Sequence, residues 1–181
     1  MKRTADLPRH PPPVVGFADC YMGGFVDGLH MHDRAQLSVF LSGSVTVNTQ
    51  DASFVLGPGQ AMWIPAKMVH QATCRTDLVF QVVYVEEGFK GTEQLACKMF
   101  DASSLIRGLV DEIIAMTFHF AMDERMSAIA RLLVDEIERA PRIADRLFFP
   151  SDPRLRRVCE AIIAQPGDCH DIDYWAREAG M

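Results

Sequence analysis

Three of the six histidines stand at positions from which they could bind one common ligand. His30 and His32 are two residues apart, so on a β-strand their imidazoles point to the same face. Gln36 has the same parity on an unbulged strand, and His70 follows a turn at Pro65. Two imidazoles from one strand and a third from another make a common geometry for divalent transition metals such as nickel or zinc. The pattern therefore predicts a metal site formed by His30, His32, Gln36 and His70.

The same histidines permit a second interpretation, in which they line a pocket for an organic effector. A neutral imidazole donates a hydrogen bond from one nitrogen and accepts one at the other, so the rings could bind a polar group without a metal. We expect Phe40, Trp63 and Cys74 to contribute to the wall of this pocket. Cys74 could also be a soft metal ligand, but a buried free cysteine usually packs as a small apolar side chain. The residues leave metal and organic effector open.

Short strands must position these side chains. Between Val14 and Val85, β-favouring runs are broken by turn residues at Ser42-Gly43, at 48–52 and at 57–59. Leu78–Val85, with the sequence LVFQVVYV, is typical of a buried strand. Strands this short and closely spaced predict a sandwich or barrel.

Two amphipathic helices are expected after the strands. Apolar residues recur about every four positions from Leu105 to Ile114 and again from Met126 to Ile137. Asp101 is the expected N-cap of the first helix, and Pro141 ends the second. Their apolar stripes could pack on the barrel or meet a second copy in a dimer, and the spacing favours the barrel.

Composition limits the function classes. The formal net charge is −6 at pH 7, whereas an isolated DNA-binding domain is usually basic. The five cysteines are scattered without a CxxC pair, which indicates a reducing cytoplasmic compartment. No apolar run approaches the roughly 20 residues that span a bilayer, so we expect no membrane association. The first 13 residues lack the apolar core of a secretory signal.

Two segments resemble the two cupin motifs. The spacing of the first motif is kept by Gly24, His30, His32, Gln36 and Gly43. The spacing of the second is kept by Gly57 or Gly59, Pro65 and His70. This resemblance implies a mostly β fold with α: a cupin (double-stranded β-helix, jelly-roll) barrel followed by antiparallel helices.

Three positions depart from the cupin pattern. Gln36 replaces the glutamate ligand of the family and is a poorer partner for a hard divalent ion. Lys67 stands where the second motif has glycine, and Cys74 stands where it has asparagine. These departures bear on the metal, not on the fold.

The last part of the chain resembles the start of an AraC-type DNA-binding domain. The resemblance is carried by Ser151–Leu155, Val158, Ala161-Ile162, Pro166, Trp175-Ala176 and Ala179–Met181. It implies a homodimeric regulator whose recognition helix would follow this chain, so only the full-length protein would bind DNA and no DNA-binding residue is expected here. The sequence patterns HxHxxxQL and WIPxxxxH resemble those of the subgroup that includes nickel-responsive repressors of efflux pumps.

The predicted organisation has five parts. They are a flexible N-terminus (1–13), a cupin effector-binding barrel (14–98), a helical dimerisation element (99–141), a linker (142–152) and the first helices of a truncated helix-turn-helix domain (153–181). The predicted function is effector sensing and dimerisation in a transcription regulator. The alternative is a metal-dependent cupin enzyme, a dioxygenase or isomerase. We expect no enzyme, because the glutamate is missing and no general base stands out near the histidines.

Overall fold

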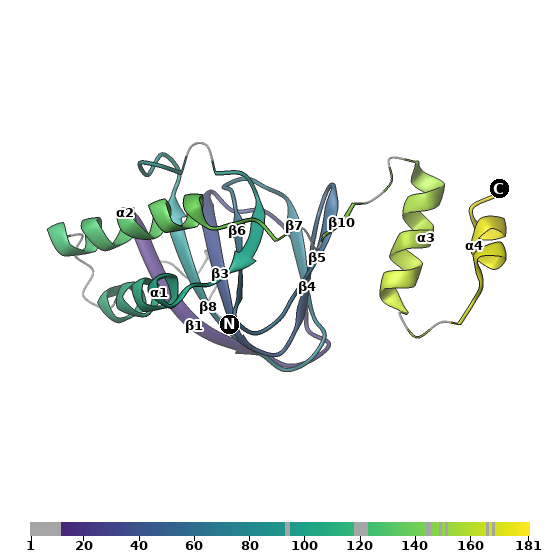
Figure 1. Ribbon diagram of the computed structural model, residues 1–181, viewed down its shortest axis with the longest axis horizontal. Coiled ribbons are helices and arrows are strands. Elements are labelled where there is room, and N and C mark those ends of the chain that lie inside the picture. The colour runs from purple at the N-terminus through teal and green to yellow at the C-terminus, as the bar shows by residue number, and fades with distance from the viewer. Residues whose placement is uncertain are drawn as a thin grey trace.

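Two five-stranded antiparallel sheets face each other in the computed structural model (Figure 1). The structure describes residues 12–92, 95–117, 123–143, 146–148, 150, 152–165, 167 and 169–181. The first sheet contains, in spatial order, β1 (Val14–Tyr21), β8 (Leu78–Glu86), β3 (Arg34–Ser42), β6 (Gln60–Ile64) and β9 (Lys98–Asp101). The second contains β10 (Arg146–Phe148), β5 (Ala52–Leu56), β4 (Val45–Thr49), β7 (His70–Cys74) and β2 (Val26–His30). The predicted mostly β cupin barrel is confirmed.

The first sheet is buried on both faces. Along β3, Phe40 belongs to the core between the two sheets, whereas Leu37 and Val39 belong to a second core on the outer face. This separation follows from the period-two alternation of side chains in a strand. It explains why Leu78–Val85 is apolar at every position except Gln81, because residues on both faces of the strand, such as Val82 and Val83, are buried.

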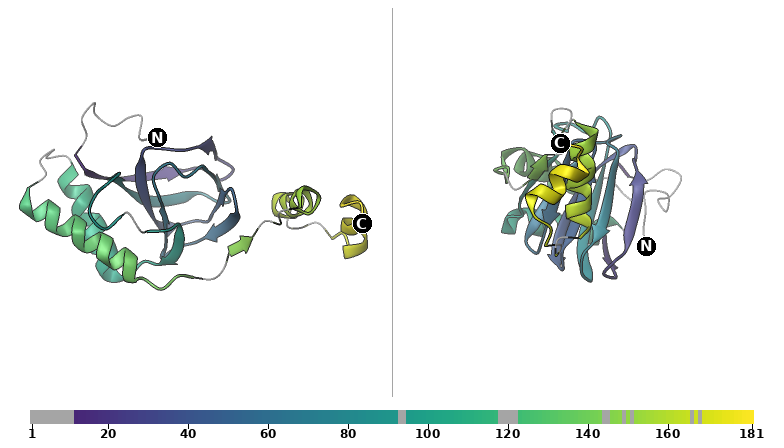
Figure 2. Two further views of the ribbon diagram at one scale, coloured as in Figure 1. Left: turned by 90° about the horizontal axis from the view of Figure 1, so that it is seen from above. Right: turned by 90° about the vertical axis from the view of Figure 1, so that its right-hand side faces the viewer.

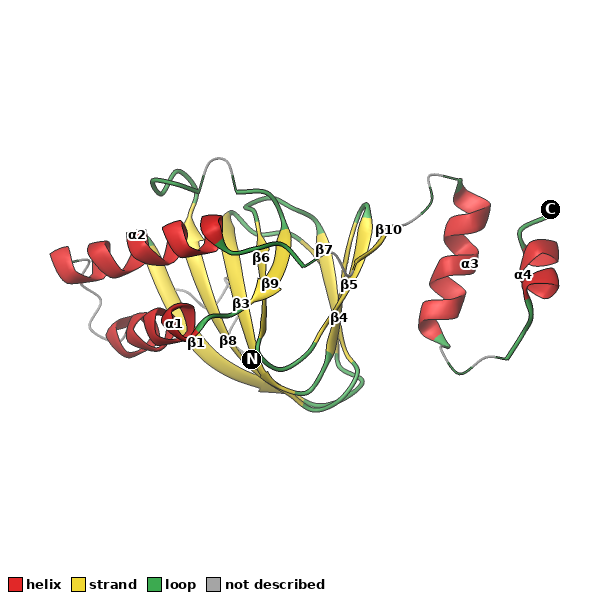
Figure 3. Cartoon of the chain, in the orientation of Figure 1, coloured by secondary structure: helices red, strands yellow, loops and turns green. Residues whose placement is uncertain are grey.

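Helices α1 (Ser104–Thr117) and α2 (Glu124–Arg139) cover that outer face (Figures 1 and 3). Ile106, Val110 and Ile113 of α1 are buried, as are Leu133 and Ile137 of α2. The apolar stripes therefore pack on the barrel, as their spacing favoured.

The predicted cap of α1 is wrong. Asp101 belongs to β9, and Ser103 supplies the cap instead, because its Oγ accepts a hydrogen bond of 3.1 Å from the backbone N–H of Ile106. Both Asp and Ser are good N-cap residues, so sequence preference does not separate them. Asp123 caps α2 by accepting from the N–H of Met126.

The segment predicted as a linker contains β10, which pairs with β5. A strand of three residues carries too little pattern to predict. Beyond it, α3 (Pro153–Ala164) and α4 (Ile172–Glu178) lie past one end of the barrel (Figure 2). Arg156 of α3 donates a hydrogen bond of 3.0 Å to the carbonyl of Gln50, which links this helix to a barrel turn. Among the helices that the structure describes, none is long and apolar enough to cross a membrane.

Candidate metal centre and effector cavity

A cavity of about 380 Å³ lies between the two sheets. Alternate residues of β8 line it, from Leu78 to Tyr84. Leu78 pairs with Tyr21 at one end of the strand, and Tyr84 pairs with Gln36 near the other. The cavity therefore extends along the barrel, with an aromatic end and a histidine end.

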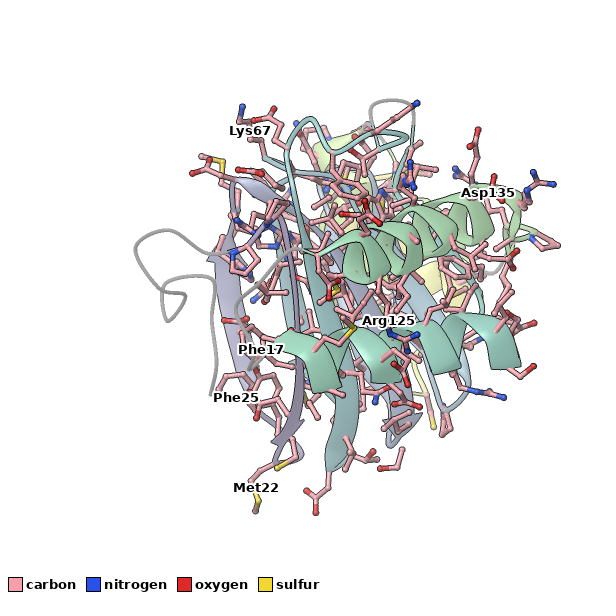
Figure 4. All side chains as sticks on the ribbon, turned by 90° about the vertical axis from the view of Figure 1, so that its left-hand side faces the viewer. Phe17, Met22, Phe25, Lys67, Arg125 and Asp135 are labelled. Atoms are coloured by element: carbon pink, nitrogen blue, oxygen red, sulfur yellow. The ribbon has the colours of Figure 1, made fainter. Side chains whose placement is uncertain are left out.

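The two ends differ in chemistry. At the first, the ring of Tyr21 lies 4.5 Å from that of Phe25 and 5.1 Å from that of Phe80, measured between centroids. At the other, the backbone N–H of Lys67 donates to the carbonyl of His32. Figure 4 shows Lys67 and Met22 at opposite ends of the barrel, with Phe25 towards the Met22 end.

The structure brings His30, His32 and His70 together. Their ligand nitrogens all lie within 4.8 Å of one another. His70 begins β7 and pairs with His30, the last residue of β2. His32 lies in the loop after β2 rather than on the strand, so the predicted parity does not explain its position. His32 and His70 are buried, and His30 is half-buried.

Hydrogen bonds to the backbone fix the tautomer of each histidine. Nδ1 of His30 lies 2.7 Å from the carbonyl of Gly28, and Nδ1 of His70 lies 2.9 Å from that of Met68. Nδ1 of His32 contacts the carbonyl of Arg34 in the same way. A carbonyl oxygen only accepts, so each Nδ1 carries the hydrogen. Each Nε2 then keeps its lone pair for a ligand, as in metal-binding histidines oriented by backbone carbonyls.

Gln36 stands beside this set. Its Oε1 lies 2.8 Å from Nε2 of His32, and its Nε2 donates to Oγ of Ser38 at 2.8 Å. Two acceptors face each other in this arrangement. Either a cation satisfies both of them, or the amide turns over and presents its N–H to His32. The donor set therefore fits a divalent transition metal.

The buried histidines are neutral at pH 7. Burial, together with the nearby His30 and His32, lowers the pKa of His70 to about 4. Burial also lowers the pKa of His32. Neutral imidazole is the form that binds a metal.

Two of the three predicted pocket residues line the cavity, and the third does not. Phe40 and Cys74 line the cavity, and burial raises the pKa of the Cys74 thiol, which keeps it protonated. The placement of Trp63 in the pocket is wrong. Met62 and Ile64 line the cavity, so the residue between them faces the opposite side, where Trp63 packs in the core under α1 and α2.

Tyr84 and Asp27, which lie beside the histidines, were not predicted from the sequence. Tyr84 packs edge-on against His32, with 5.6 Å between ring centroids, and Asp27 approaches His30. The run LVFQVVYV marked Tyr84 as buried without giving its face. Asp27 has the wrong parity relative to His30 on a regular strand, and no sequence signal corrects this.

The comparisons with known proteins agree with this architecture. The model of the family described as the AraC-like ligand binding domain matches residues 11–148. The HTH-type transcriptional regulator NimR of Escherichia coli (strain K12) is 25% identical over 173 residues, which are 93% of this chain and 62% of that protein. The chain thus spans less than two thirds of its relative's length.

Two solved structures with a likeness to the chain each cover less than half of it. An RmlC-like cupin from Shewanella frigidimarina is 21% identical, with a TM-score of 0.39, over 42% of this chain and 68% of that one. The DMSP lyase DddQ from Ruegeria pomeroyi is 16% identical, with a TM-score of 0.39, over 47% of this chain and 42% of that one. The family match rests instead on most of the chain. By that match, the chain belongs to the family of AraC-like ligand-binding domains.

Proposed function

We propose that this chain is the sensing part of an AraC-type transcription regulator and that a divalent transition metal in the barrel is its effector. The family match over residues 11–148 and the relative described as a transcriptional regulator support the regulatory role. A metal bound in the barrel would then control DNA binding by the helix-turn-helix domain of the full-length protein.

One observation carries the metal proposal. Each of the three histidines has Nδ1 committed to a backbone carbonyl, so three Nε2 lone pairs remain within one small site. His30, His32 and His70 would hold the ion, with Oε1 of Gln36 as a further donor. Imidazole-rich sites suit zinc and nickel.

The ion would supply a fixed positive charge that joins separate elements. His30 ends β2, His70 begins β7, and Gln36 lies in β3 of the opposite sheet. Ligands from both sheets would be drawn towards one point, so binding would favour one arrangement of the sheets over others. A ligand can shift an equilibrium only through such a difference in affinity.

A small organic effector is the second candidate, because most of the cavity extends away from the histidines. Its volume of about 380 Å³ lies within the range of small-molecule sites, and Tyr21, Phe25 and Phe80 form an aromatic wall. Metal and organic effector need not exclude each other.

The partners follow from the same proposal. We expect a homodimer that places two DNA-binding domains on two half-sites, in the cytoplasm. Leu105 of α1 and Leu132 of α2 are more than two-fifths exposed, which supports a contact through the helices. Light scattering on the purified chain measures this state directly.

The first experiment is the metal content of the untagged chain after dialysis against zinc, nickel and cobalt. We expect close to one equivalent in the wild type and none in a His30→Ala/His32→Ala variant. His170→Ala is the matched control, since this histidine is exposed in the C-terminal part of the chain and packs against the rings of Tyr174 and Trp175. No retained metal in the wild type would refute the metal effector and direct the search to organic ligands.

The same samples separate regulation from catalysis. If the chain is a sensor, the metal-loaded protein should not convert any small molecule. Turnover of any small molecule, lost in the His30→Ala/His32→Ala variant, would restore the alternative of a cupin dioxygenase or isomerase.

A further inference from the structure

The pairing of β2 with β7 is irregular at the metal site. Asp27 pairs with Ala72, and the next pair is His30 with His70, so β2 advances by three residues while β7 advances by two. This is a β-bulge, a feature that is frequent beside functional sites and re-aims side chains. On a regular strand Asp27 and His30 would face opposite sides, but here their side chains approach each other.

The bulge brings the carboxylate of Asp27 close to His30. Oδ2 of Asp27 lies 3.8 Å from Nε2 of His30. Two ligands of one ion lie at most about 4.2 Å apart, which is twice a metal–nitrogen distance of about 2.1 Å. The separation of Asp27 from His30 satisfies this limit. Among the described residues that line the cavity, Asp27 is the sole acid.

The charge of the site gives Asp27 a role. The three imidazoles and the amide of Gln36 supply no negative charge, so a divalent ion would keep its full charge in a mostly buried site. An uncompensated buried charge is costly, and a carboxylate ligand reduces it. We propose that Asp27 is the anionic ligand of this metal site, replacing the acid that is absent at position 36. This inference rests on the proposed metal-binding function.

A carboxylate can also act from outside, by orienting a histidine that binds the ion. Such a partner contacts the ring nitrogen that faces away from the metal. In His30 that nitrogen is Nδ1, which already contacts the carbonyl of Gly28. Asp27 approaches Nε2 instead, so it lies on the side of the ring where the ion would bind.

The test compares zinc and nickel affinities of the whole chain by competition with a chromophoric chelator. Asp27→Asn keeps the size of the side chain and removes its charge. We expect at least about a tenfold loss of metal affinity. Removing a residue that only hydrogen-bonds to a metal ligand already costs about tenfold or more, so removing a ligand should cost at least as much. Asp33→Asn is the control, because it removes the same charge from an exposed loop position outside the cavity. We expect it to bind within about twofold of the wild type.

A second variant distinguishes ligation from folding. In Asp27→Asn/Gln36→Glu, the carboxylate is moved to the neighbouring position, and we expect most of the lost affinity to return. The absorption spectrum of bound Co²⁺ should change in Asp27→Asn and remain unchanged in Asp33→Asn. Loss of affinity without recovery in the double variant, together with a lower unfolding temperature of the metal-free protein, would assign Asp27 a folding role and overturn the inference.

The experiments distinguish a failure of the proposed metal-binding function from a failure of the proposed role of Asp27. If the wild type binds metal through its histidines and Asp27→Asn binds equally well, only the role of Asp27 is refuted. If the wild type binds no metal, the proposed function itself fails.

Discussion

The ammonium group of Lys98 donates a hydrogen bond of 3.0 Å to the backbone carbonyl of Ala140, the C-cap residue of α2. A second bond of 3.1 Å goes to the carbonyl of Glu138. Lys98 lies in β9 and is only 7% exposed, and burial lowers the pKa of its side chain. A barrel strand thus caps the last turn of the helix, where backbone carbonyls have no partner within the helix.

Replacing Lys98 by methionine should destabilise the protein by about 1–3 kcal/mol, because carbonyls at the helix end lose their charged donor while the apolar volume is kept. Urea unfolding measures the difference. Lys90→Met, at an exposed position, should change the free energy of unfolding by less than about 0.5 kcal/mol. Equal stability of the two variants would show that the Lys98 cap contributes nothing.

Stability of the metal-free protein should fall as the pH falls from 6.5 towards 4. The pKa of His70 is 6.5 in its ordinary state and about 4 when folded, so in this window the unfolded chain binds a proton that the folded chain excludes. Above pH 6.5 both states are neutral and His70 has no effect. The full loss is on the order of 3 kcal/mol. Urea unfolding after chelation, in a pH series, measures it.

The variant His70→Gln isolates this contribution. It lacks the titrating group, so its stability should depend less steeply on pH over the same range. Parallel curves for the wild type and the variant would show that His70 is not the source.

Trp63 should matter for stability and not for the ligand. Its side chain is fully buried on the face of β6 that is turned away from the cavity. Trp63→Ala should cost about 3–5 kcal/mol through the space that it leaves. Trp63→Phe should keep zinc affinity within about twofold. A strong change of affinity in the phenylalanine variant would return Trp63 to the pocket.

Replacing either of two glycines by alanine should change the stability of the protein, but in opposite directions. Gly43 has a φ of 81°, and a Cβ there would lie 2.0 Å from the carbonyl oxygen of Asp77. Gly43→Ala should therefore destabilise strongly, since the clash is with backbone. Gly108 lies inside α1 with open space around it, and Gly108→Ala should stabilise by about 0.5–1 kcal/mol. Thermal unfolding of both variants tests the pair.

Much of the fold could be predicted because the signals were local. The turn at Gly43 and the apolar period of α1 and α2 each lie within one short stretch of chain. β10 gave no such signal, since its place depends on pairing with β5, far away in the sequence. Asp101 is a second example of such long-range pairing. It is a good capping residue, but it belongs to β9 because that strand pairs with β6, and so it does not cap α1.

The histidines of the site could be predicted because the cupin motifs indicate which residues come together, even where the local backbone geometry is not known. The histidines were identified correctly as neighbours, although His32 lies in a loop and not on the expected strand. Trp63 was assigned to the wrong face, because its face depends on the register Leu37↔Trp63, which only the assembled sheet fixes. Asp27 was missed for a related reason, since a bulge changes parity without changing composition.

The bulge in β2 also determines how far apart in the sequence an acid and a histidine can lie while sharing one side of this strand. Asp27 and His30 are three residues apart and share one side of the strand because of the extra residue, whereas an acid two residues before a histidine would share its side on a regular strand. Among related sequences, an acid three residues before the first histidine should therefore accompany a neutral residue at position 36. Where position 36 is glutamate, the earlier acid and the extra residue become dispensable. Natural variation would then contain the same exchange of carboxylates that mutagenesis can make in this chain.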